Sequence, residues 1–376
     1  MNYIELNNQV IIRDENGKYQ LNKDKEALKS YLEDYIEPKM KKFDNLNDRL
    51  NYLVENDYYS KEILDLYDQY VIDVIYDFIR AKNFKFQSYM SASKFYQNYA
   101  LKSNDGEEIL ENYEDKVLIV ALTLGNGEPK LAKDIAEKLI NQEFQPATPT
   151  FLNAGRARGG KMVSCFLVNV EDSCEGISYA VSSANHLSKI GGGVALNLTR
   201  LRASGESIKG IKGAAGGVMG VAKLLEQSFS YFNQMGARQG AGAVYLNVLH
   251  PDFETLLDSK KINADEKIRL TTLSIGAIIP DKFMELAEKN EKCYAFYPHS
   301  IYQKYGVHLD GIKMDEWYDK LANDDEIEKK EINPRELLTR IAQTQQESGY
   351  PYVVFIDSAN EQHTLKDVGM IKMSNL

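Results

Sequence analysis

A cysteine among glycine-rich turns has the clearest chemical potential in this sequence. Cys165 stands beside Ser164 in the run MVSCFLVNV, and the surrounding residues 145–202 contain several turns rich in glycine. A thiolate is a nucleophile and a redox group, and glycine turns let backbone N–H groups converge on phosphate. Together they indicate redox chemistry on a nucleotide. By itself, Cys165 is better explained as a small buried apolar residue of a strand.

The neighbours of Cys165 therefore decide the hypothesis. Thr148 precedes Pro149, and we expect this extended segment to run alongside the cysteine-bearing strand. Gly191, Gly192 and Gly193 follow a predicted helix and open another strand, where missing side chains let a ligand approach the backbone. Three consecutive glycines alone are a weak signal.

A second group of residues has the chemistry of an anion site. Asp172 and Ser173 precede a predicted helix, and Arg202 leads into the loop SGESIKGIKGAAGG at 204–217, which contains two lysines. Arginine can hold a phosphate with two parallel hydrogen bonds, and glycines free backbone N–H groups for the same anion. The pattern is neither a Walker A motif nor a GxGxxG fingerprint. A mobile surface loop explains it equally well.

A third glycine loop, at 236–242, contains Arg238 and Gln239 as its only long polar side chains. They would read a base or phosphate, unless the loop is a plain helix end and turn. The histidines form no metal-binding pattern, so we predict no metal site, and His250 before Pro251 is expected in a turn.

The composition narrows the class of protein. With 376 residues and a net charge of -10, the chain is large enough for two or three domains and too acidic for a general nucleic-acid binder. Three irregularly spaced cysteines favour a reduced cytoplasmic setting. No apolar run reaches the length needed to cross a membrane.

The hydrophobic pattern changes along the chain. Up to about residue 145 it has the helical period, and beyond 162 short β-rich runs alternate with helical segments, which indicates an α/β domain. The expected helices are 23–35, 60–78, 107–124, 129–141, 176–189, 217–235, 281–289 and 334–347. The expected strands lie within 162–170, 193–198, 242–249, 268–279 and 350–356. The charged run 323–331 is predicted to be a solvated loop or helix end.

Six motifs resemble the large (α) subunit of class I ribonucleotide reductase. They are ATPTFLNAG, MVSCFLV, KIGGGVALNLTRLRASGESI, GARQGAGAVYLNVLHPDF, LLDSKKINADEKIRLTTLSIG and KMSNL, of which NADEKIR is most like class Ib. The resemblance implies a helical N-terminal region at 1–85 without a full ATP cone, and an all-α domain at 86–161. It also implies that 162–376 is the first part of a ten-stranded α/β barrel, which is truncated. The implied activity is thiyl-radical reduction of ribonucleoside diphosphates.

The resemblance also assigns roles to residues. Thr148, Ser164, Cys165, Gly193 and Asn375 would contact substrate, with Asn375 and Cys165 as catalytic residues and Cys165 as one of two redox-active thiols. The other thiol of that pair is missing from this sequence, and Cys174 does not match it.

The remaining implied residues belong to allosteric control. A deoxynucleotide effector would be bound by Asp172, Ser173, Arg202, Ile208 and Lys209. Arg238 and Gln239 would lie on the loop that relays effector identity to the active site.

The implied partners follow from the same family. No cofactor would be bound directly: the radical would come from a metal-containing small (β) subunit, electrons from a thioredoxin- or glutaredoxin-type reductant, and control from dNTP or ATP. An α homodimer is expected. The family continues Ser-Asn-Leu with Cys-x-Glu, whereas this sequence ends at Leu376. We therefore expect an N-terminal portion that is inactive without the C-terminal remainder of the subunit. The alternative is a non-catalytic deoxynucleotide-binding module that associates with a complete reductase subunit.

Overall fold

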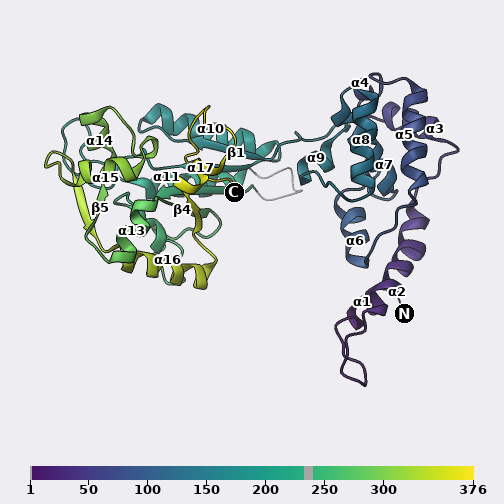
Figure 1. Ribbon diagram of the computed structural model, residues 1–376, viewed down its shortest axis with the longest axis horizontal. Coiled ribbons are helices and arrows are strands. Elements are labelled where there is room, and N and C mark those ends of the chain that lie inside the picture. Colours follow the sequence, from purple (N-terminus) through teal and green to yellow (C-terminus); the bar gives the residue numbers. More distant parts are fainter. Residues whose placement is uncertain (1, 233–239) are drawn as a thin grey trace. The chain divides into compact units, whose positions relative to one another are not determined.

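The computed structural model divides the chain into two compact units, Met1–Val163 and Ser164–Leu376. It describes residues 2–232 and 240–376. Figure 1 shows that the first unit is helical and that the second combines helices with a sheet. Each unit has its own hydrophobic core, so each is described by itself.

The first unit is built around one helix that is buried almost all round. This helix, α7 (Tyr113–Gly125), contains the apolar run VLIVAL, whose six residues are all buried. Asn112 caps its first turn in a reciprocal pair with Asp115, and a left-handed Asn126 ends it. The surrounding helices are α1 (Tyr3–Gln9), α2 (Asn22–Ser30), α3 (Leu46–Glu55), α4 (Lys61–Leu64), α5 (Gln69–Ala81), α6 (Tyr89–Asn98), α8 (Pro129–Ile140) and α9 (Thr148–Asn153).

Two of the expected helices in this unit have different limits. The helix predicted at 60–78 is interrupted, because Tyr67 leaves the helical path and its hydroxyl contacts Leu122 O at 2.9 Å and Gly127 N at 2.9 Å. The helix predicted at 107–124 begins only after the cap at Asn112. Those predicted at 23–35 and 129–141 are confirmed, the former continuing from α2 into a π-helical turn, Tyr31–Ile36.

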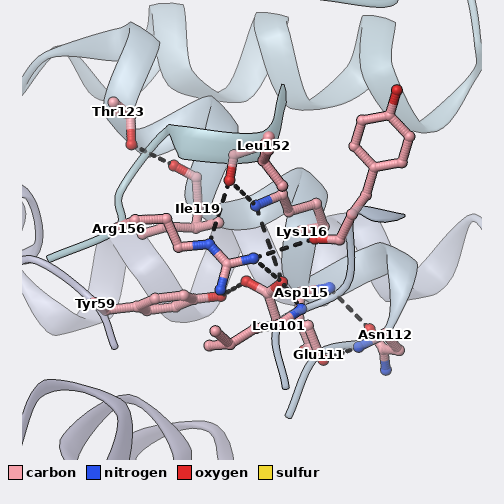
Figure 2. Close-up of polar contacts among 11 residues, drawn as sticks. Tyr59, Leu101, Glu111, Asn112, Asp115, Lys116, Ile119, Thr123, Leu152 and Arg156 are labelled. Carbon is pink, nitrogen blue, oxygen red and sulfur yellow. Dashed lines mark hydrogen bonds and ion pairs between the residues drawn. The ribbon is translucent and has the colours of Figure 1, made fainter. Parts of the chain in front are cut away.

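A buried charge cluster joins several segments of the helical unit (Figure 2). The Glu111 carboxylate accepts hydrogen bonds from Arg156 at 3.0 Å, from the Tyr59 hydroxyl at 2.5 Å and from Leu101 N at 2.8 Å. Lys116 lies 3.9 Å away and donates to Leu152 O at 3.1 Å. These bonds tie the start of α7 to the end of α9.

Burial and charge act in opposite directions in this cluster. Burial alone would raise the pKa of Glu111, but Arg156 and Lys116 outweigh it and hold that pKa below its usual range. Burial lowers the pKa of Lys116 to about 8, against the opposing effect of Glu111. The Glu111 carboxylate therefore offsets the free-energy cost of burying the two cations.

The second unit contains a five-stranded, wholly parallel sheet in the order β1-β2-β3-β4-β7. Its strands are β1 (Cys165–Asn169), β2 (Gly193–Asn197), β3 (Gly242–Asn247), β4 (Ser274–Ile279) and β7 (Tyr352–Phe355). All five expected strands are present. The strand expected within 268–279 starts late because the Glu226 carboxylate accepts from Thr271 N and Thr272 N at 2.6 and 2.9 Å.

Helices cover one face of this sheet. They include α10 (Cys174–Lys189), α11 (Val218–Tyr231), α12 (Phe253–Asp258), α13 (Asp281–Lys289), α14 (Pro298–Tyr305), α15 (Met314–Ala322) and α16 (Pro334–Ser348). The last helix, α17 (Ile356–Gln362), follows β7, and its Ile356 packs with residues of the opposite face. Alternate strand residues such as Val194, Leu196, Val244 and Leu246 belong to the large core under the helices. The four helices predicted in this region are confirmed, with ends shifted by at most four residues. The last three residues of the prediction at 217–235 lie outside the described residues.

The opposite face of the sheet has a small core of its own. Ala195, Ala243, Tyr245 and Ile278 cluster there with Met373 from the end of the chain. A Cβ at Gly276 would lie 2.2 Å from the Tyr245 ring, so this glycine makes room for the tyrosine. This face, called the inner face below, is thus covered by a segment distant in sequence.

The sheet is open within the described residues. Both edge strands expose apolar side chains, among them Leu167 on β1 and Phe355 on β7. The α/β prediction is confirmed. The prediction of a solvated loop or helix end at 323–331 is wrong for its last three residues, because β6 (Lys329–Ile332) pairs antiparallel with β5 (Cys293–Phe296). Among the described helices, none has an apolar stretch long enough to cross a bilayer.

Replacing Glu111 by alanine tests the buried cluster. We expect the free energy of unfolding to fall by about 3–5 kcal/mol, because Arg156 and Lys116 would remain buried without their carboxylate. Urea denaturation of the 376-residue chain measures this change. Asp65→Ala, which removes an exposed ion pair with Lys61, is the control and should change stability little. Equal effects of the two substitutions would contradict this assignment.

Candidate functional site

The inner face of the sheet brings together four of the residues predicted to bind substrate. Ser164 Oγ lies 3.9 Å from Cys165 Sγ, and the side-chain amide of Asn375 donates to the same sulfur at 3.5 Å. Gly193 is the register partner of Cys165 on the neighbouring strand. A residue 210 positions away in sequence therefore contacts the thiol.

Gly193 lies close to the segment that carries Asn375. Its N–H donates to Ser164 O at 2.6 Å, and an added Cβ would lie 2.8 Å from Leu376 Cδ2. A larger residue would require the Leu376 side chain to shift. Cys165 is exposed, which corrects the alternative of a buried apolar residue: it starts an edge strand, so one of its sides has no neighbouring strand among the described residues.

The segment that carries Asn375 is fixed at several points. The Tyr245 hydroxyl donates to Asn375 O at 2.8 Å, and Met373 is buried against the sheet. Further back, the Asn360 side chain accepts from Ile371 N at 2.7 Å and donates to Ile371 O at 2.9 Å. Sequence reasoning missed Tyr245 and Asn360, because no spacing in the sequence relates either residue to Cys165 or Asn375.

Thr148 belongs to the helical unit, whereas these four residues belong to the α/β unit. The prediction that it sits in an extended segment is wrong: Thr148 is the first residue of α9, and Pro149 occupies the next position, where its missing N–H costs nothing. Its hydroxyl lies 3.1 Å from the Tyr99 hydroxyl. The polar group remains half-buried at the start of a helix.

Three of the five predicted effector residues, Asp172, Ser173 and Arg202, border a pocket of about 270 Å³. Arg202 Nε donates to Asp172 Oδ2 at 2.6 Å, and Arg202 Nη1 donates to Ser207 O at 2.8 Å. Ser173 caps α10 by accepting from Gly176 N at 2.9 Å. The lining residues are Glu171, Asp172, Ser173, Arg200, Arg202, Pro298, His299, Tyr302 and His308.

The loop at 204–217 has hydrogen bonds between its own residues. Gly205 N donates to Ala215 O at 3.0 Å, and Ile208 and Ile211 exchange two backbone bonds around a turn in which Lys209 has a φ of 51°. Ile208 and Lys209 form this turn and are not among the residues that line the pocket. The structure therefore brings Asp172, Ser173 and Arg202 together, with the loop beside them.

Aromatic and titratable residues from α14 and the turn after it complete the pocket. The rings of Tyr302 and His308 stack with centroids 4.6 Å apart. Burial and the neighbouring arginines, Arg202 and Arg200, lower the pKa of His299 and His308 respectively. Burial raises the pKa of Glu206, in the loop, to about 7. Sequence reasoning missed these residues, because no local spacing relates them to Arg202.

Other predictions have simpler outcomes. Arg238 and Gln239 lie outside the described residues. His250 is a buried turn residue, as predicted: one ring nitrogen contacts Leu201 O at 2.9 Å and the other accepts from Asp252 N at 3.1 Å. In the described part of the chain, no group of three or more His, Cys, Asp or Glu residues is placed to hold a metal ion.

Comparisons with known proteins agree along the whole chain. Residues 163–376 match the family described as ribonucleotide reductase, barrel domain. Residues 3–84 match ribonucleotide reductase N-terminal, and residues 85–159 match ribonucleotide reductase, all-alpha domain. The open parallel sheet is thus part of a barrel-domain fold.

Individual relatives give the same result. The chain is 52% identical over 374 residues to a ribonucleoside-diphosphate reductase subunit alpha of Bacillus subtilis, which covers 100% of this chain and 53% of the relative. A protein of that name from Mycoplasma genitalium is 44% identical over 374 residues. The aligned region is 100% of this chain and 51% of the Mycoplasma protein. One from Synechocystis is 32% identical over 274 residues, or 70% of this chain and 36% of the relative. The chain belongs to the family of class I ribonucleotide reductase large (α) subunits, and it spans about half the length of the Bacillus and Mycoplasma relatives.

The raised pKa of Glu206 predicts a pH-dependent stability. A carboxyl that is protonated up to about pH 7 when folded, but titrates near 4.5 when unfolded, stabilises the fold below pH 4.5 and loses that contribution as pH rises through 7. Glu206→Gln, which mimics the neutral acid, should therefore gain at least about 1 kcal/mol over the unchanged chain between pH 5 and pH 8.

Urea unfolding at the two pH values measures the difference. Glu347→Gln, at an exposed position of α16, is the matched control. A Glu206→Gln advantage that does not grow with pH would contradict the assignment.

Proposed function

We propose that this chain supplies the N-terminal part of a ribonucleoside-diphosphate reductase α subunit, which reduces ribonucleoside diphosphates to deoxyribonucleoside diphosphates. The observation that carries the proposal is the contact of Asn375 with Cys165, beside Ser164 and Gly193 on the inner face of a parallel sheet. A thiol, an amide and a hydroxyl converge where glycine leaves the backbone accessible. These polar groups can form hydrogen bonds with a sugar that has two hydroxyl groups.

The residues would divide the work by their chemistry. Cys165 and a second thiol, supplied from outside the present residues, would together give up two electrons and form a disulfide. The 2′ hydroxyl of the ribose would leave as water, with its place taken by hydrogen. Asn375 would hold the ribose hydroxyls through its amide, and Thr148 and Ser164 would bind substrate through hydroxyl and backbone groups. An external thioredoxin- or glutaredoxin-type dithiol would restore the cysteines.

The pocket beside Arg202 is proposed to bind a deoxynucleoside triphosphate or ATP as effector. Arg202 supplies a cation with donors to spare, and Asp172 supplies an acceptor for a sugar hydroxyl. Ser173, Ile208 and Lys209 would complete the site, and Arg238 and Gln239 would relay its occupancy to substrate. The stacked Tyr302 and His308 rings offer an apolar wall next to these charges.

The family also supports a proposal for organisation and partners. We assign 1–85 to a class Ib-type N-terminal region without a full ATP cone, 86–161 to the all-α domain and 162–376 to the first part of the barrel. The subunit would work in the cytoplasm as a homodimer with a small subunit whose metal centre supplies the radical. Reduction would also need the C-terminal half that the Bacillus relative possesses.

Effector binding is tested by Arg202→Ala in the 376-residue chain. Loss of a charge-assisted hydrogen bond should weaken binding of a deoxynucleoside triphosphate by about 1.5–3 kcal/mol. Isothermal titration with dTTP measures the affinity, and Arg158→Ala, an exposed arginine of the helical unit, is the control. Unchanged affinity in Arg202→Ala would remove this residue from the site.

The redox role of Cys165 is tested in a chimera that joins this chain in frame to the C-terminal half of the 52% identical Bacillus relative. With a small subunit and dithiothreitol, Cys165→Ser should abolish turnover and leave dTTP affinity intact, because serine cannot form the disulfide. Cys174→Ser is the matched control and should retain turnover. A chimera that binds dTTP without turnover in its unchanged form would favour a non-catalytic nucleotide-binding module instead.

A further inference from the structure

A buried carboxylate in the α/β unit lies between the two candidate sites. Asp310 belongs to a short 3-10 turn, Leu309–Gly311, and its side chain is only 2% exposed. It is surrounded by donors: Arg200 Nε lies 3.0 Å from each carboxylate oxygen, Asn197 Nδ2 donates at 3.1 Å and Lys372 Nζ lies 3.7 Å away. A carboxylate this deeply buried depends on such partners.

One of these partners belongs to the pocket proposed to bind the effector. Arg200 lines that pocket, and its Nη1 also contacts the half-exposed Glu171. Arg200 therefore divides its donors between a carboxylate at the pocket wall and the buried Asp310. Any anion that enters the pocket competes with both for the same guanidinium.

The other cation belongs to the segment at the thiol. Lys372 lies between Ile371, which is fixed by Asn360, and Met373, which is buried on the inner face of the sheet. Three residues beyond Lys372, the Asn375 amide contacts Cys165. The position of Lys372 thus bears directly on where Asn375 lies.

The remaining donor anchors Asp310 to the rigid part of the sheet. Asn197, at the end of β2, is fully buried and its Nδ2 also donates to Asn169 Oδ1 at 3.3 Å, at the end of β1. Its Oδ1 accepts from Thr199 N at 3.1 Å. Asp310 is therefore held in place, and the two cations on either side of it are the groups that can adjust.

We infer that Asp310 is a positioning residue that links the Arg200 wall of the nucleotide pocket to the segment 371–376 carrying Asn375. This inference rests on the proposed function for the identity of the ligand. An anionic ligand that accepts hydrogen bonds from Arg200 weakens the ion pair between Arg200 and Asp310. Asp310 then interacts more strongly with Lys372 and holds the segment 371–376 more tightly. Coupling of this kind is a free energy shared by two sites and acts in both directions.

The first part of the test is independent of nucleotide. Hydrogen–deuterium exchange of the peptide covering 371–376 is measured in the 376-residue chain, in Asp310→Asn and in Lys372→Gln. Both substitutions should speed exchange at Ile371 and the amides after it by roughly threefold or more, after correction for sequence. Lys366→Gln, an exposed lysine six residues before Lys372, is the matched control and should leave exchange unchanged.

The second part adds saturating dTTP. In the unchanged chain, dTTP should slow exchange in 371–376 by roughly twofold or more. In Asp310→Asn and Lys372→Gln, the nucleotide should still bind but no longer slow that exchange. A purely structural role for Asp310 would alter the first measurement and leave the dTTP response in place.

The outcomes separate the two proposals. Unchanged exchange in folded Lys372→Gln, or a dTTP response that survives both substitutions, overturns the role of Asp310. A lack of dTTP binding to the unchanged chain refutes the effector site and leaves the first part to decide whether Asp310 positions the segment. Lys372 is partly exposed, so its substitution tests the link even if Asp310→Asn fails to fold.

Discussion

The structure of the α/β unit depends on the space above the inner face of its sheet. The terminal segment lies there beside small residues: Gly193 faces Leu376, and Gly276 makes room for the Tyr245 ring. Tyr245 in turn holds the backbone of Asn375. The space left by these two glycines and the hydrogen bond from the Tyr245 hydroxyl together place the Asn375 amide at the thiol of Cys165.

Buried charge is the second constraint, and it acts in both units. In the helical unit, Glu111 balances Arg156 and Lys116 and so connects α7 with α9, the helix that begins at Thr148. In the α/β unit, Asp310 is set between Arg200 and Lys372. Buried ion pairs add little net stability, but removing one partner is costly, so they fix which segments must stay together.

Much of the fold could be predicted because it depends on local pattern. Period and turn chemistry identified the helix α13 and all five parallel strands, since buried strands read as short apolar runs. The pattern failed where side chains override it: Tyr67 interrupts a periodic stripe, and Glu226 takes the N–H groups of Thr271 and Thr272. The pairing of β5 with β6 was missed because β6 has three consecutive charged residues and the two strands are separated by α14 and α15 in the sequence.

Motifs predicted the first residues of the candidate site but not the residues that complete it. The resemblance pointed to Cys165 and Asn375, whose contact spans 210 positions, but no spacing rule relates Tyr245, Asp310 or Tyr302 to them. The proposed function depends above all on Cys165 being oxidised when substrate is reduced. A single turnover of the chimera without external reductant, followed by mass spectrometry of its cysteines, tests this directly. The proposed function predicts deoxynucleotide in proportion to Cys165 found in a disulfide; deoxynucleotide formed while Cys165 remains a free thiol would contradict it.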